Sequence, residues 1–191
     1  MSAGYRPPWI AVPPRSGPAW AVGAAEAVWE RSGVAARAGE PGALAVALAC
    51  AAERFAAVRP GFALFLHLPG PREPLLPVWA GGVECAGDPR EAVRWWAGAD
   101  DPGAVEPPVV EEFASAALGA GVRVLRYAVD PGDPSGSLTV GLRYVWHVPA
   151  GSGPGALACL FAVSPDPARL LAARGDLDAF ARALPTPAGA P

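Results

Sequence analysis

The stretch LTVGLRYVWHV, residues 138–148, decides the fold because apolar and mixed positions alternate along it. Successive side chains of a β-strand point to opposite faces of the sheet. The even positions form an unbroken apolar face: Leu138, Val140, Leu142, Tyr144, Trp146 and Val148. The odd positions form a mixed face: Thr139, Gly141, Arg143, Val145 and His147. This pattern predicts a strand with one face in the core, where the polar atoms of Tyr144 and Trp146 each need a partner.

Further strands are expected on both sides of this one in the sequence. Residues 122–129 (VRVLRYAV) precede it across a turn rich in Asp, Pro and Gly, and residues 156–163 (ALACLFAV) follow a Gly-rich turn. Residues 62–68 and 75–85 flank a loop with three prolines, which predicts a loose hairpin. Residues 109–118 have good helix propensity, but the GAG that follows them could equally close a hairpin. We expect a strand there and keep the helix as the alternative.

Helices are expected where apolar residues recur every three or four positions. The segments with this spacing are residues 18–32, 40–59, about 89–98 and a closing helix that runs to Leu184. Asp88 and Asp166 each precede a proline, so each is expected to cap a helix whose first turn contains that proline.

The order of these elements predicts an α+β fold, in which helices cover an antiparallel β-sheet. A chain of 191 residues is long enough for one domain with a core of its own. We expect a proline-rich N-terminal segment at 1–17 with a candidate edge strand at 9–12, a single domain at 18–184, and a frayed tail at 185–191.

Composition and charge exclude several classes of protein. The net charge is −3 and there is no basic run, which argues against nucleic acid as a partner. No stretch reaches the roughly 20 apolar residues of a membrane span, and the N-terminus lacks the pattern of a signal peptide. Cys50, Cys85 and Cys159 are far apart, as expected for reduced thiols. These observations predict a cytoplasmic protein that does not insert in a membrane.

No motif for catalysis, for a metal or for a cofactor is present, so we expect none of the three. His67 and His147 lack the spacing of metal ligands, and we expect two ordinary, half-buried histidines. Ser152 lies outside any G-x-S-x-G motif, and the GSGPG around it lacks the residues of a P-loop. Glu111 and Glu112 are adjacent, so in a strand they point apart and cannot act as a pair on one substrate.

Two groups of residues are candidates for an interaction surface. If 122–129 pairs with 138–148, Arg143 approaches Arg123 or Arg126 on the outer face of the sheet; the alternative is an ordinary solvated face. The second group is formed by Trp79, Trp95 and Trp96. Neighbouring residues of a helix point roughly 100° apart, so at least one of Trp95 and Trp96 is expected to be exposed and able to dock a partner.

The C-terminal half resembles a known superfamily. VRVLRYAV, LTVGLRYVWHVP, ALACLFAV and then SPDPARLLAARGDLDAFARAL follow each other like the closing hairpins and helix of PsbP-like proteins. That superfamily includes photosystem accessory proteins, a Ran-binding nuclear import factor and actinobacterial lipoproteins. The resemblance covers about residues 60–184 and rests on element order. It implies an α/β/α sandwich, with helices on both faces of the sheet, and binding rather than catalysis. The chain departs from the lipoproteins because it has no lipobox cysteine.

We therefore expect a non-catalytic, cytoplasmic protein-interaction module of bacterial origin, an adaptor or accessory subunit with an unidentified protein partner. The alternative is a small-molecule-binding protein or small enzyme, with a pocket between sheet and helices around His67, Arg143 and His147. A third hypothesis is self-association through exposed tryptophans.

Overall fold

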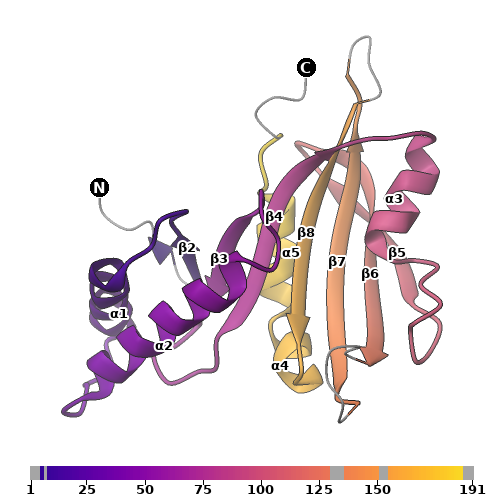
Figure 1. Cartoon of the computed structure of the whole chain (residues 1–191). Coiled ribbons are helices and arrows are strands. Elements are labelled where there is room, and N and C mark those ends of the chain that lie inside the picture. Colours follow the sequence, from indigo (N-terminus) through magenta and orange to yellow (C-terminus); the bar gives the residue numbers. More distant parts are fainter. Residues whose placement is uncertain (1–4, 7, 130–135, 151–154, 187–191) are drawn as a thin grey trace. The chain divides into compact units, whose positions relative to one another are not determined.

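The structure is a computed structural model that describes residues 5–6, 8–129, 136–150 and 155–186 (Figure 1). The chain divides into two compact units, Met1–Trp79 and Ala80–Pro191, which we call unit 1 and unit 2. The sequence had indicated a single domain over 18–184. Both units combine antiparallel strands with helices, so the expected α+β class is confirmed.

Unit 1 contains two helices and the first strands of the chain. The strands β1 (Tyr5–Arg6), β2 (Trp9–Val12) and β3 (Ala63–His67) are antiparallel neighbours. Strand β2 is present as predicted, but it is not an edge strand because β1 and β3 pair with its two sides. The helices α1 (Pro18–Ser32) and α2 (Glu40–Ala56) contact each other, and both begin with a proline in the first turn.

Unit 2 is built on a meander of four strands. They are β5 (Val109–Ser115), β6 (Gly119–Val129), β7 (Leu138–Val148) and β8 (Ala156–Ser164). Each strand pairs antiparallel with the next one in the chain. The ambiguous segment at 109–118 is therefore a strand. Strand β4 (Leu76–Glu84) begins in unit 1 and ends in unit 2, and it is a hydrogen-bonded neighbour of β3.

Most even-numbered side chains of β7 are buried, as the alternation in its sequence predicts. Val140, Tyr144 and Trp146 are all 0% exposed, and Leu142 is 2% exposed. Leu138, at the start of the strand, is an exception because it is 41% exposed. The aromatic side chains of β7 are therefore core residues, as the sequence predicts.

Helices cover both faces of this meander. Helix α5 (Arg174–Arg182) lies on the even face of β7, since Asp178 accepts a hydrogen bond from Tyr144. Helix α3 (Pro89–Ala97) lies on the odd face, where the Arg143 side chain binds the main-chain oxygen of Trp96. The α/β/α arrangement is thus present in unit 2. The odd face of β7, which was predicted to be mixed, is partly covered by α3: Val145 is 0% exposed, whereas Arg143 and His147 are half-buried.

The closing helix is divided in two. Asp166 caps α4 (Pro167–Ala172) as predicted, accepting hydrogen bonds from the main-chain N–H groups of Ala168 and Arg169. Ala173, with ψ of −7°, then separates α4 from α5. No helix in the described part of the chain is long and apolar enough to cross a membrane.

Candidate functional site

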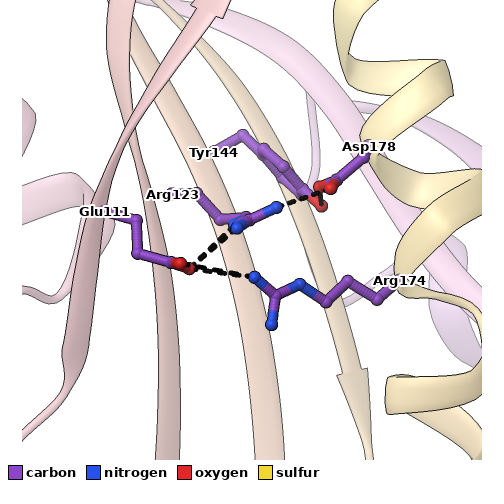
Figure 2. A network of polar contacts seen from close by, with 5 residues as sticks. All are labelled: Glu111, Arg123, Tyr144, Arg174 and Asp178. Atoms are coloured by element: carbon purple, nitrogen blue, oxygen red, sulfur yellow. Dashed lines mark hydrogen bonds and ion pairs between the residues drawn. The ribbon is translucent and has the colours of Figure 1, made fainter.

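Five charged and polar side chains meet between the meander and α5 (Figure 2). The guanidinium of Arg123 on β6 donates to Glu111 Oε2 on β5, at 2.8 and 3.1 Å, and to Asp178 Oδ2 on α5, at 2.5 Å. The hydroxyl of Tyr144 donates to Asp178 Oδ1 at 2.6 Å, and Arg174 donates to Glu111 Oε2 at 3.1 Å. Each carboxylate of this polar network therefore binds at least one arginine.

The polar network fixes α5 on the sheet. The side chains of Arg123 and Asp178 are only 11% and 17% exposed, so their charges need each other. Arg123 is opposite Tyr144 in the strand register, which places it on the core face with α5. The prediction of Arg123 in an exposed interaction surface is therefore wrong, and we assign it a structural role.

Burial raises the pKa of the Tyr144 phenol above its ordinary value, and the hydrogen bond to Asp178 raises it further. Above pH about 10 the unfolded chain releases this proton while the folded protein keeps it, so the free energy of unfolding falls as pH rises. Wild type should therefore lose about 1 kcal/mol more than Tyr144→Phe between pH about 10 and about 11. Urea denaturation of both proteins at the two pH values measures this difference, and equal losses would contradict it.

A groove lies in unit 2 between α3 and the strands β5 and β6, on the side of the sheet opposite the polar network. It has a volume of about 890 Å³. The residues that matter for its chemistry are Arg90, Val93, Glu112, Ala114, Val122 and His147. We call it the α3 groove.

Local sequence features shape the α3 groove. Asp88 caps α3 by accepting hydrogen bonds from the main-chain N–H groups of Arg90 and Glu91, which fixes the start of the helix. Glu111 and Glu112 point to opposite faces of β5, as predicted, so only Glu112 reaches the groove. Gly155 has φ of +80°, and a Cβ there would lie 2.8 Å from His147 Nε2. A glycine at this position therefore leaves room for the imidazole.

Charges of both signs line the α3 groove. Arg94 is held by Asp100, whose pKa is lowered by this hydrogen-bonded ion pair. Within the described residues, Arg90 and Glu112 have no ion-pair partner. The groove can therefore bind a molecule that carries ionised groups and an apolar part. In the described part of the chain, no cluster of His, Cys, Asp or Glu could hold a metal ion.

Arg126 and Arg143 lie on the face of the sheet that α3 covers. Of the two predicted neighbours of Arg143, Arg123 and Arg126, it is therefore Arg126 that shares its face. Arg126 binds Asp101 at 2.6 Å, and Arg143 Nη1 donates to the main-chain oxygen of Trp96 at 3.3 Å. Positive charges at the C-terminal end of a helix stabilise it. These arginines therefore hold the end of α3 in place, and both are largely engaged within the fold.

The three candidate tryptophans have different environments. Trp79 is 4% exposed, and its indole N–H donates to the main-chain oxygen of Phe55, so its predicted place in an interaction surface is wrong. Trp95 is 73% exposed, which confirms that one residue of the Trp95–Trp96 pair faces solvent. Trp96 is half-buried and stacks on Phe161.

The two histidines belong to different units. His67, in unit 1, is 1% exposed and its ring makes an edge-type contact with the ring of Trp9, so it is more buried than predicted. His147 is half-buried in unit 2 and lines the α3 groove, whereas Arg143 binds the end of α3. Of the predicted pocket residues, His147 lines the α3 groove, and Arg143 is not among the residues that line it. Ser152 lies outside the described residues.

Sequence reasoning missed most of both sites. The polar network could have been found in part, because a turn at 115–119 places Glu111 directly opposite Arg123 on paired strands. Asp178, Arg90 and Glu112 carry no comparable signal, since their neighbours depend on how the helices pack.

The fold and the groove define unit 2 as an α/β/α sandwich with a groove of ligand size beside α3. No protein-family model matches the chain, and neither does any curated protein or solved structure. The resemblance to PsbP-like proteins therefore stays a prediction.

Proposed function

We propose that unit 2 is a binding module and that the α3 groove takes a small amphipathic organic molecule with at least one ionised group. The observation that carries the proposal is the volume of about 890 Å³, enclosed on one side by a helix and on the other by a sheet. Sites for small ligands typically measure about 300–1,000 Å³ and combine apolar walls with a few polar groups.

The lining of the α3 groove supports such a ligand. Val93, Ala114 and Val122 provide apolar surface, and they come from three different elements. Arg90, Glu112 and His147 supply charge or hydrogen bonds around this surface. Binding rather than catalysis is also what the resemblance to PsbP-like proteins implies.

A test uses 8-anilinonaphthalene sulfonate, a fluorescent probe with an apolar body and one negative charge. We expect native protein to bind it saturably. Ala114 is an exposed residue of the groove, so Ala114→Trp fills the space and should weaken binding by about tenfold or more. A fluorescence titration measures the dissociation constant of the probe for wild type and for Ala114→Trp.

Ala116→Trp is the matched control, because Ala116 is also exposed but does not line the groove. This variant should bind the probe like wild type. Equal binding by Ala114→Trp and wild type would contradict the proposal, and so would a wild-type protein that does not bind the probe.

A second candidate is a protein-interaction module in the bacterial cytoplasm, an adaptor or a self-associating subunit. Trp95 favours it, because a tryptophan that is 73% exposed is typical of interaction surfaces. Absence of probe binding to wild type would favour this second candidate over the first.

A further inference from the structure

A second, smaller hollow lies in unit 2 along another side of α3. It has a volume of about 380 Å³ and is lined by Glu84, Ala86, Glu91, Ala92, Trp95 and Trp96. We call it the tryptophan hollow. Residues four apart lie on the same side of a helix, so Glu91 and Trp95 form one pair along its wall, and Ala92 and Trp96 form another.

The two indoles pack edge to face. Their ring centres are 5.3 Å apart and their planes meet at 81°. Trp96 is held in place because its ring stacks on Phe161, at 6.3 Å and 20°. Trp95 leaves 73% of its surface open. The hollow therefore presents an exposed indole to solvent beside a second, fixed aromatic ring.

The charge of the tryptophan hollow is negative. Glu84 and Glu91 are both exposed, and neither has an ion-pair partner among the residues that the structure describes. No arginine lines the hollow. Arg90 and Arg94 line the α3 groove instead, so α3 carries its cations towards one side and its unpaired carboxylate towards the other.

Perpendicular tryptophans beside unpaired carboxylates have the chemistry of a site for an organic cation. The face of an indole attracts positive charge, and proteins use this attraction to bind quaternary ammonium groups. A quaternary ammonium group has no N–H to donate, so it needs no hydrogen-bond acceptor and can bind against aromatic rings. Nearby carboxylates attract its positive charge over a longer distance. We propose that the tryptophan hollow binds the trimethylammonium group of a small molecule. This site is separate from the α3 groove and does not depend on its ligand.

The test uses choline chloride as the probe, at constant ionic strength, with the full chain. In isotope-labelled protein we expect saturable shifts of the indole N–H signals of Trp95 and Trp96. The uncharged carbon analogue of choline, with carbon in place of nitrogen, should bind about tenfold more weakly because it lacks the cation.

Two kinds of variant localise the site. Trp95→Leu should weaken choline binding by about tenfold, since it removes an aromatic ring that is 73% exposed. Glu84→Gln and Glu91→Gln should each weaken it by about threefold. Glu106→Gln is the matched control, because Glu106 is also an exposed carboxylate of unit 2 but lines neither the tryptophan hollow nor the α3 groove, so it should leave choline binding unchanged.

Three outcomes would overturn the proposal: no saturable shift with choline, equal binding of the carbon analogue, or unchanged binding by Trp95→Leu. A peptide with trimethylated lysine is an additional probe. If it bound about tenfold more tightly than choline, the cation would belong to a protein partner, and the assignment to a small molecule would be wrong. None of these results depends on whether the α3 groove binds its own ligand.

Discussion

Replacement of Gly121 by alanine is expected to lower the free energy of unfolding by about 3 kcal/mol. Gly121 lies directly opposite Trp146 in the register of β6 and β7. A Cβ on Gly121 would lie 2.7 Å from Trp146 Cγ and 2.6 Å from the main-chain oxygen of Val145. Carbon atoms do not approach this closely, so either the indole or a strand must move.

The indole has no free direction in which to move. Trp146 is 0% exposed, and its ring is stacked on Tyr144 and in edge contact with Phe113. An aromatic ring that covers a glycine on the neighbouring strand is a known way to fill the space that the missing side chain leaves. The methyl group of alanine would compete for that space.

Gly141→Ala provides the matched control for Gly121→Ala. Gly141 is also buried in the same meander, but the nearest atom to its added Cβ would be Arg126 Cγ at 3.6 Å, an ordinary contact. This variant should stay within about 1 kcal/mol of wild type. Urea denaturation followed by circular dichroism measures all three proteins. Similar losses for the two variants would contradict the role assigned to Gly121.

Arg123→Met is expected to lower the free energy of unfolding by about 3 kcal/mol, because it leaves the carboxylate of Asp178 largely buried without its cation. The hydrogen bond from Tyr144 remains, but a neutral hydroxyl does not compensate a charge. The cost should come mostly from this unpaired charge. Arg123→Met combined with Asp178→Leu should therefore be at least about 1 kcal/mol more stable than the sum of the two single variants predicts.

Arg174→Met is the control for Arg123→Met. Arg174 is also an arginine of the polar network, but its side chain is 39% exposed and it binds Glu111 alone within the network. Exposed ion pairs contribute little, so this variant should lose less than about 1 kcal/mol. If Arg174→Met and Arg123→Met lost equal stability in urea denaturation, the burial argument would fail.

The sequence allowed the meander to be predicted because alternation within a strand is local. The face on which Tyr144 and Trp146 lie follows from parity alone, and so do the opposite directions of Glu111 and Glu112. The capping residues Asp88 and Asp166 were also predictable, because a cap involves only its own helix.

The sites could not be predicted to the same extent because they depend on contacts between distant elements. Parity places Arg123 and Arg143 on opposite faces of the meander only when the register of β6 and β7 is known. The burial of Trp79 depends on Phe55, which is 24 residues away in the chain. The α3 groove exists because α3 packs on strands that follow it in sequence, and no local pattern carries that information.

The polar network has a consequence for synthesis on the ribosome. Asp178 is added 55 residues after Arg123, whereas Glu111 is made 12 residues before it. At a translation rate of roughly 5–20 residues per second, about 3–11 s pass between the addition of Arg123 and the addition of Asp178. The strands of the nascent meander can pair during this interval. On the face that α5 will cover, however, Arg123 then has Glu111 as a partner but not yet Asp178. The last helix to be translated is therefore the element that completes unit 2.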